Sequence, residues 1–177
     1  MDEINPYEQF DSVPSFTVRS TDISHGKALH AAHRGAGAGG EDLSPQLSWS
    51  KFPAGTQSFA VTCFDVDAPT GSGFWHWAVY NIPASVTSLD TGAGTLGGAL
   101  SPRARTLKNE LRRREFAGAE PPEGTGTHRY VFAVHAVDVE QLELDSESTP
   151  AVLGFNLHYH TLARALLIAT AAFGDKI

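Results

Sequence analysis

The sequence predicts a mostly β protein, folded as an antiparallel β-sandwich with long loops and one helix near its C-terminus. Two observations support this class. Short runs of β-branched and aromatic residues are separated by dense punctuation, with 17 glycines and 10 prolines among 177 residues. The spacing of these runs is irregular and the loops between them are long, which fits a sandwich better than alternating βαβ units.

Composition indicates one folded domain, which we place at residues 1–177 with 1–14 as an N-terminal extension. Hydrophobic residues make up 41% and charged residues 19%, a composition of neither disordered chains nor membrane proteins. No window approaches the ~20 apolar residues of a membrane span. The acidic start lacks the basic and apolar regions of a secretory signal. We therefore expect a cytoplasmic protein without stable membrane insertion.

Net charge and cysteine content exclude further classes of protein and of metal site. The chain has 20 acidic and 13 basic residues, a net charge of −7, which argues against nucleic acid as a partner. The single cysteine, Cys63, excludes a disulfide framework and a thiolate zinc site. Its neighbours Thr62 and Phe64 indicate a packed strand, so Cys63 is expected in the core.

The clearest strand candidates are residues 15–18, 58–64, 76–82 and 128–139. The last run is apolar on both parities: Tyr130 and Phe132 face one way, Val131 and Ala133 the other. A strand that is apolar on both faces lies between two layers. By contrast, residues 35–42 (GAGAGGED) have no side chains able to pack, so we expect a mobile surface loop. Residues 91–104 look similarly irregular.

A helix is predicted to begin at STPAVLGF. Thr149 can cap the open backbone amides, and Pro150 fits the first helical position because its missing N–H costs nothing there. The end of this helix is ambiguous. Residues 165–173 (ALLIATAAF) can extend it or begin a final buried strand, since periodicity does not separate the two.

The segment DVDAPTGSGFWHW, residues 65–77, places acids and a histidine where strands end and begin. Side chains alternate along a strand, so Asp65 continues the apolar face of Val61 and Cys63. A carboxylate there is costly unless a partner satisfies it. After the turn, His76 opens the next strand between Trp75 and Trp77. If the two strands are neighbours, His76 can lie near Asp65.

Such an acid–histidine pair has a defined chemistry. A carboxylate that accepts one imidazole N–H fixes the tautomer, raises the pKa of the ring and leaves the other nitrogen for a ligand. An imidazolium in an apolar pocket would then favour an anion. Alternatively, Asp65 and Asp67 cap a turn, and His76 is a rim residue with its own hydrogen bonds.

A second segment, residues 118–132 (GAEPPEGTGTHRYVF), repeats this design. A Pro/Gly loop leads to His128 at the start of the longest predicted strand, and Tyr130 shares its parity. Two separate loops that each deliver a histidine to a strand end favour a common pocket.

These motifs resemble those of the phosphatidylethanolamine-binding protein family, which includes the Raf kinase inhibitor proteins. The first match is DVDAP (65–69) followed by FWHW (74–77), and the second is PPEGTGTHRY (121–130). The bacterial branch adds LSPQLSW (43–49) and GFNLHYHTLARA (154–165). The resemblance covers the chain from about residue 15 to residue 173.

The resemblance implies an antiparallel sandwich whose C-terminal helix stops near Leu162 and is followed by a short strand. It also implies a small pocket for phosphate-like or carboxylate anions, without a cofactor. Asp65, His76 and His128 formally make a two-histidine, one-carboxylate metal set, but the resemblance does not support a metal. The ligand-binding residues that it implies are Asp65, Asp67, His76, Trp77, Pro121, His128 and Tyr130.

Three departures from the family pattern stand out. Val66 replaces the usual proline between the aspartates, so this rim is expected to be less rigid or to be shaped for a different ligand. Glu120 stands where a small or neutral residue is usual; facing inward beside Asp65 it would raise one carboxyl pKa, as a general acid requires. It can equally point outward. Residues 112–114 are three arginines, either a solvated run or a basic lip that attracts anions.

Three functions remain open at this stage. The first is binding of a small anionic or polar metabolite without chemical change. The second is a cofactor-independent acid–base enzyme (a cyclase, isomerase, lyase or hydrolase), with Asp65 or Glu120 as acid or base and His76 and His128 stabilising an oxyanion. The third is regulation of a kinase or protease. Bacterial relatives also suggest a homodimer.

Overall fold

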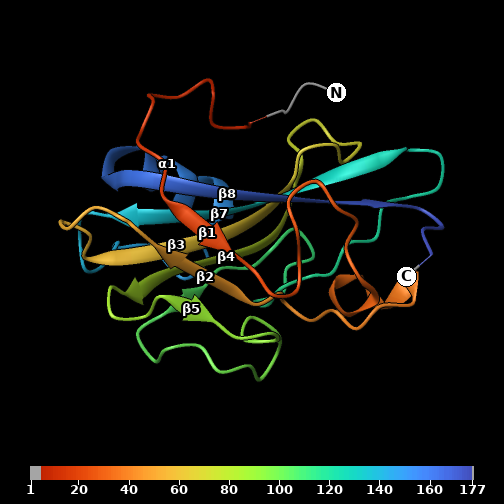
Figure 1. Ribbon diagram of the computed structural model, residues 1–177, viewed down its shortest axis with the longest axis horizontal. Coiled ribbons are helices and arrows are strands. Elements are labelled where there is room, and N and C mark those ends of the chain that lie inside the picture. Colours follow the sequence, from red (N-terminus) through yellow and green to blue (C-terminus); the bar gives the residue numbers. More distant parts are fainter. Residues whose placement is uncertain (1–4, 177) are drawn as a thin grey trace.

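Two antiparallel sheets form the sandwich that the sequence predicts (Figure 1). The computed structural model describes residues 5–176. The larger sheet has the strand order β6-β4-β3-β7-β8. Its strands are β3 (Ser58–Asp65), β4 (Phe74–Pro83), β6 (Arg105–Thr106), β7 (Thr127–Val137) and β8 (Thr161–Ala172). The smaller sheet joins β1 (Thr17–Arg19), β2 (Leu47–Ser50) and β5 (Ser88–Leu89) in the order β1-β2-β5.

The main core fills the space between the two sheets. Phe59, Val61 and Cys63 of β3 are fully buried there, which confirms Cys63 as a core residue. Phe132 of β7 joins this cluster, while Val137 belongs to a second cluster on the other face of the sheet. The prediction that this strand is buried on both faces is therefore confirmed, because β7 has apolar layers on either side.

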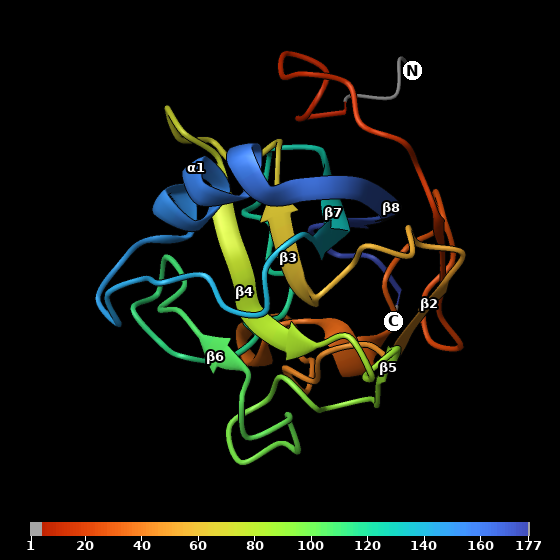
Figure 2. The same ribbon diagram turned by 90° about the vertical axis from the view of Figure 1, so that its left-hand side faces the viewer.

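Helix α1 (Pro150–His160) covers the outer face of the larger sheet, opposite the smaller sheet (Figure 2). It begins as predicted, with the Thr149 hydroxyl accepting a hydrogen bond from the backbone amide of Val152 at 3.3 Å. Leu153 and Leu157 are its buried contacts with the sheet. The chain then enters β8 at once. The predicted order of helix and strand is confirmed, but the strand is long, because it pairs with β7 along its whole length.

The glycine-rich segment 35–42 differs in part from expectation. It forms a single 3-10 turn at Ala36–Ala38, and Gly35 donates a backbone hydrogen bond to Ala119 O at 3.0 Å. Ala119 N donates in turn to His33 O at 3.1 Å. The segment lies at the surface as expected, and backbone hydrogen bonds hold it against residues 118–120, which the sequence does not predict. Small side chains are what allow this close approach of two backbones.

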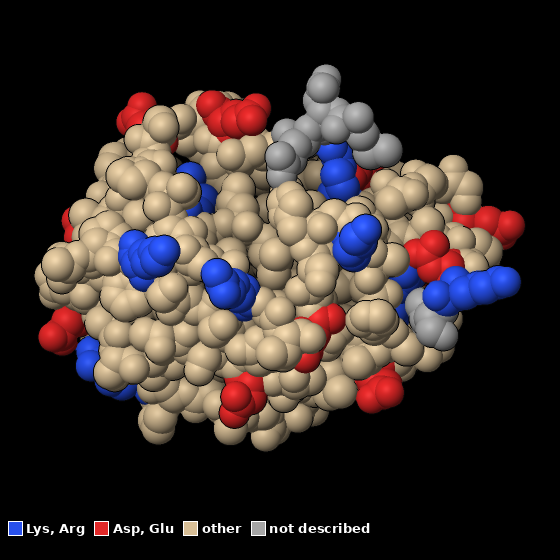
Figure 3. All heavy atoms as spheres, viewed as in Figure 1, with Lys and Arg blue, Asp and Glu red and all other residues tan. Residues whose placement is uncertain are grey.

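On the face shown in Figure 3, acidic and basic side chains are interspersed, and neither kind gathers in a large patch. Among residues 5–176, no helix has the length and apolar character needed to cross a bilayer. The cytoplasmic location stays a prediction.

Candidate ligand-binding site

A cavity of about 700 Å³ opens where β3 ends and where β4 and β7 begin. Its volume lies within the usual range of small-molecule sites. Segments 36–42, 68–70 and 111–122 complete its wall. The polar residues that line it are Asp42, Asp65, Thr70, His76, Arg113, Glu120, His128 and Tyr130, and its apolar lining includes Phe74, Leu111, Pro121 and Pro122. Both predicted histidines therefore reach one cavity.

Asp65 and His128 form a buried hydrogen-bonded pair at the inner end of this cavity. Asp65 at the end of β3 lies opposite Tyr130 on β7, which places His128 diagonally across on the same face. His128 Nδ1 lies 2.7 Å from Asp65 Oδ2, and the two side chains are only 1% and 4% exposed. Asp65 Oδ1 accepts a second bond from the amide of Asp67 at 2.9 Å. The cost of burying this carboxylate is thus offset by hydrogen bonds.

The Asp65–His128 pair also contacts or influences Thr125 and Tyr130. His128 Nε2 lies 2.8 Å from the hydroxyl of Thr125, which also donates to Pro122 O at 2.7 Å. This chain of contacts fixes the ring plane of His128. Burial, together with the nearby Asp65 carboxylate, raises the pKa of the Tyr130 hydroxyl, so that this wall residue stays neutral.

His76 is oriented by a backbone carbonyl instead of an acid. Its Nδ1 lies 2.9 Å from Ala117 O, and a carbonyl only accepts, so Nδ1 carries the hydrogen. Nε2 then presents a lone pair, and it has no hydrogen-bond partner among residues 5–176. The expectation that Asp65 orients His76 is wrong, because the 111–118 segment brings the Ala117 carbonyl to the ring first.

The pKa of His76 also departs from expectation. Burial lowers it, and this effect outweighs the opposing influence of the Ala117 carbonyl and the Asp65 carboxylate. The ring packs edge-on against Tyr130 at 5.1 Å and lies 5.0 Å from Phe74. His76 is therefore a neutral hydrogen-bond acceptor in an aromatic setting, and the predicted rise in its pKa is corrected.

Asp67 and Trp77, predicted as ligand-binding residues, do not line the cavity. Asp67 accepts hydrogen bonds from Arg129 N at 2.8 Å, Nε at 2.7 Å and Nη2 at 2.5 Å. Trp77 is fully buried in the main core, edge-on to Phe116. Trp77 faces away because it directly follows the cavity-lining His76 on β4, where side-chain direction alternates. Asp67 lies beyond the end of β3, where the chain turns and its carboxylate meets Arg129.

Val66, between the two aspartates, has a contact of its own. Its amide donates to Arg129 O at 3.2 Å, which extends the pairing of β3 with β7 beyond Asp65. Proline has no N–H and would not make this bond. The substitution thus adds a backbone tie at the rim, where the sequence predicts reduced rigidity.

Glu120 lines the cavity on the side of the glycine-rich segment. A Cβ at Gly35 would lie 2.6 Å from Glu120 Oε2, and one at Gly37 would collide with Oε1, so the two glycines make room for the carboxylate. The acids around the cavity are therefore Asp42, Asp65 and Glu120. This partly answers the open question of its orientation: the Glu120 carboxylate is at the cavity wall, although the residue is exposed.

Asp42 is a cavity residue that sequence reasoning missed. Its carboxylate accepts hydrogen bonds from Gly118 N at 2.7 Å and Ala36 N at 3.0 Å. It thereby joins two loops that are far apart in the chain. The sequence carries no signal for this role, since Asp42 only ends a glycine-rich run.

One of the three consecutive arginines reaches the cavity. Arg113 lines it, and its Nη1 lies 3.2 Å from Glu115 Oε1. Arg114 turns to Glu147, at 2.6 Å. The basic lip thus consists of Arg113. Within residues 5–176, no group of three or more His, Cys, Asp or Glu side chains is placed to hold a metal ion.

Comparison with known proteins assigns the family. The model of the phosphatidylethanolamine-binding protein family matches residues 19–172. The chain belongs to this family. It is 43% identical over 152 residues to the UPF0098 protein YbhB of Escherichia coli, covering 85% of this chain and 96% of that protein. It is 44% identical over 154 residues to the UPF0098 protein YbcL of E. coli, covering 85% and 84% of the two chains.

Solved structures of family members agree. The crystal structure of E. coli YbcL superposes with a TM-score of 0.83 at 43% identity, covering 88% of this chain and 97% of that one. The phosphatidylethanolamine-binding protein of Plasmodium vivax gives a TM-score of 0.57 at 19% identity, covering 93% and 90%, and shows a shared fold only. The sandwich with its C-terminal helix is therefore the fold of this family.

The Asp67–Arg129 pair predicts a defined acid sensitivity. Hydrogen bonds from Arg129 lower the pKa of Asp67 in the folded protein. The stability that they contribute is therefore complete above the unfolded carboxyl pKa of about 3.9 and is lost as the pH falls through the lower folded value. We expect Asp67→Asn to reduce the free energy of unfolding by about 2 kcal/mol at pH 7, and by progressively less below pH ~4. Urea unfolding across this pH range measures it.

The matched control is Asp90→Asn, an exposed aspartate at the end of β5. It should unfold like the wild type at every pH. A constant difference between Asp67→Asn and wild type from pH 7 to pH 3 would contradict the assignment of this effect to the Arg129 contact.

The tautomer of His76 is a second testable feature of the family pocket in this chain. Because Ala117 O accepts from Nδ1 and burial disfavours the charged ring, we expect a neutral Nδ1–H tautomer at pH 7 and a titration midpoint below the usual ~6.5. Ring ¹⁵N chemical shifts, assigned by comparison with His76→Gln, report both. An Nε2–H tautomer or a midpoint above 6.5 would be inconsistent with this geometry.

Proposed function

We propose that the cavity binds a small molecule that carries a phosphate or carboxylate group, without changing it chemically. The observation that carries this proposal is the buried, neutral His76, whose free Nε2 belongs to a residue lining the cavity. A ligand group that hydrogen-bonds to this nitrogen would take the place of water there and fix the orientation of the ligand. Because Nε2 is an acceptor, that group must be a donor, such as the hydroxyl of a singly protonated phosphate, whereas an ionised carboxylate has no donor and would contact Arg113 instead.

The charges around the cavity favour a ligand with two kinds of polar group. Arg113 is the cation among the lining residues, and it supports an anionic group at the rim. Glu120 and Asp42 lie on the glycine-rich wall and support a cationic or hydroxyl group there. Asp65 takes no direct part in this balance, since His128 already pairs with it. A phosphorylated amino alcohol has both features.

Isothermal titration with O-phosphorylethanolamine, inorganic phosphate and acetate tests the proposal. We expect O-phosphorylethanolamine to bind, and His76→Ala and Arg113→Gln to weaken it at least tenfold, because each removes one contact of the phosphate. Glu120→Gln should weaken O-phosphorylethanolamine but leave inorganic phosphate unchanged, since only the former has an amine. His30→Gln changes an exposed histidine outside the cavity and serves as the control. No binding of any of the three compounds, or equal binding by all variants, would refute the proposal.

A second function, proton-transfer catalysis, is favoured by one arrangement of side chains. The neutral imidazole of His76 and the carboxylate of Glu120 line the same cavity, so a base and a second proton carrier are available to one substrate. In this scheme the buried pair of Asp65 and His128 holds the cavity wall in place, because both ring nitrogens of His128 are engaged, by Asp65 and by Thr125. Regulation of a kinase or protease stays a prediction on which these contacts do not bear.

Exchange of carbon-bound hydrogen with D₂O, followed by ¹H NMR on dihydroxyacetone phosphate and pyruvate, tests the catalytic alternative. We expect exchange above the buffer rate, reduced at least tenfold in His76→Ala and in Glu120→Gln. Exchange that equals the buffer rate, or that survives both Glu120→Gln and Asp65→Asn, removes catalysis and leaves the binding proposal standing.

A further inference from the structure

A second cavity, of about 540 Å³, lies on the opposite face of the larger sheet. Helix α1 forms one side of it and the N-terminal arm (residues 7–13) the other. Trp75 lines this cavity, whereas its neighbour His76 lines the first one. Since adjacent residues of a strand point to opposite faces, β4 separates the two cavities.

An imidazole without a hydrogen-bond acceptor lines this cavity. His135 on β7 is 1% exposed, and its Nδ1 accepts a bond from Arg164 Nε at 3.3 Å, so Nε2 carries the ring hydrogen. Among the residues that the structure describes, nothing accepts from Nε2. Burial beside the Arg164 guanidinium lowers the pKa of His135 to about 3, so the ring is a neutral N–H donor.

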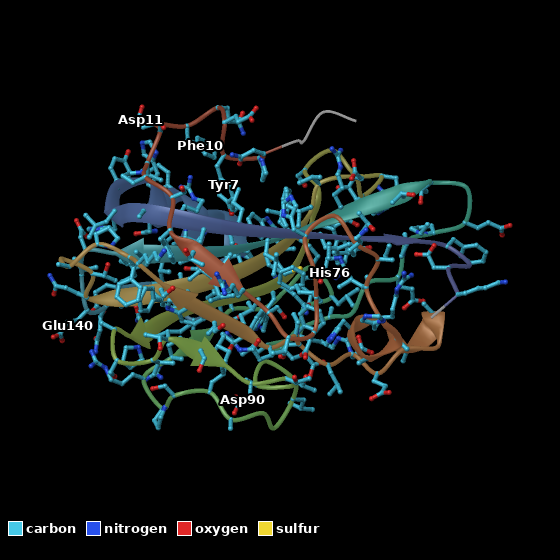
Figure 4. All side chains as sticks on the ribbon, viewed as in Figure 1. Tyr7, Phe10, Asp11, His76, Asp90 and Glu140 are labelled. Carbon is cyan, nitrogen blue, oxygen red and sulfur yellow. The ribbon has the colours of Figure 1, made fainter. Side chains whose placement is uncertain are left out.

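Arg164 is a half-buried cation without a counter-ion in the part of the chain that the structure describes. Its guanidinium lies 4.0 Å from the ring centroid of Tyr7, and no carboxylate within residues 5–176 forms an ion pair with it. The acid that lines the cavity, Asp11, is exposed, and Figure 4 shows it at the outer edge of the arm. Burial lowers the pKa of Arg164, which reflects the missing compensation.

A third polar atom here lacks a partner. Thr161 Oγ1, at the start of β8, is buried without a hydrogen bond among the described residues, and Thr161 also lines the cavity. Buried polar side chains are normally satisfied, so two orphaned atoms beside an unpaired guanidinium need an explanation. Each of the three groups can bind an oxygen atom. A ligand with an anionic oxygen would satisfy them together.

The remaining walls are aromatic and open to solvent. Phe10 of the arm is 48% exposed, and Phe155 and Tyr159 of α1 are each 65% exposed. Large aromatic side chains left in water around a polar floor are typical of sites for ligands with one apolar and one charged end. Tyr7 covers the inner end, edge-on to His135 at 5.5 Å, and points from the arm toward the sheet (Figure 4).

We propose that this second cavity binds an amphipathic carboxylate, with its carboxylate between Arg164 and His135 and its apolar body along Phe155. Because Tyr7 lies edge-on to His135 at the inner end of the cavity, its ring moves aside when the carboxylate reaches His135 Nε2. The site is independent of the first cavity, from which the sheet separates it. The ligand expected here has a single anionic head and an aliphatic or aromatic tail. It differs from the ligand proposed for the first cavity, which has a phosphate and an amine.

Octanoate is the probe, and isothermal titration of the whole chain is the measurement. We expect octanoate to bind at one site, and 1-octanol, which has the same tail without the charge, to bind at least tenfold more weakly. Arg164→Gln should weaken octanoate at least tenfold. Phe155→Asp should do the same by placing a negative charge beside the tail. Arg19→Gln, an exposed arginine of β1, is the matched control, and His76→Ala should leave octanoate binding unchanged.

Circular dichroism establishes that each variant folds. Phe155 is exposed, so Phe155→Asp decides the question if Arg164→Gln does not fold. Absence of octanoate binding, equal binding of octanoate and 1-octanol, or equal binding by Phe155→Asp and wild type would overturn the proposal. Loss of octanoate binding in His76→Ala would also overturn it, by assigning the probe to the first cavity. Failure of O-phosphorylethanolamine to bind does not affect this outcome.

Discussion

The hydrogen bond between Asp65 and His128 is the contact on which the first cavity depends. It joins the end of β3 to the start of β7 at a point where neither side chain reaches water. Removing one partner leaves the other buried and unsatisfied, which is far more costly than the net gain from the bond itself. The Pro/Gly loop before His128 is held to the same pair through Thr125. The position of this cavity wall therefore depends on the buried carboxylate of Asp65.

The two aspartates of the DVDAP segment contact different residues of β7. Asp65 turns inward to His128, and Asp67 turns to the backbone and guanidinium of Arg129 on the same strand. Val66 between them adds a backbone bond to Arg129. Three consecutive residues thus hold β7: Asp65 contacts the buried side chain of His128, Asp67 contacts the backbone and side chain of Arg129, and Val66 contacts the Arg129 backbone. This explains how a turn with two buried or partly buried carboxylates is held against β7.

Much of the fold and part of the site could be predicted from the sequence. The apolar residues along 58–64 and 128–139 predicted the buried strands, and the bounds of the predicted strands placed Asp65, His76 and His128 at strand ends. Alternation determines which face a side chain takes, but not which of two diagonal neighbours it contacts. For that reason the partner of Asp65 was predicted as His76, whereas it is His128. The orienting group of His76 is a backbone carbonyl, which has no signature in the sequence.

Loop conformation limits prediction in the same way. Asp42 is a cavity residue only because residues 35–42 fold back onto residues 118–120, and glycines leave no side-chain pattern from which to infer this. The sequence shows a run of three arginines, but only the backbone conformation of this loop determines that Arg113 faces the cavity and Arg114 faces Glu147. Glu120 is a similar case, since its position depends on the space above Gly35 and Gly37.

The two cavities differ in how completely the protein satisfies its own polar groups. In the first, Asp42, Asp65 and His128 all have partners, and His76 Nε2, an acceptor, has none among residues 5–176. In the second, the N–H of His135 has no acceptor within the same residues, and the guanidinium of Arg164 donates to His135 Nδ1 without forming an ion pair there. A chain with a net charge of −7 repels anions at long range, so an anion is held only where local cations and donors outweigh that field. Arg113 already lies beside Glu115, whereas Arg164 forms no ion pair with a carboxylate of residues 5–176. If both cavities bind anions as proposed, Arg164 should therefore hold its anion more strongly than Arg113, although the family motifs lie around the cavity of Arg113.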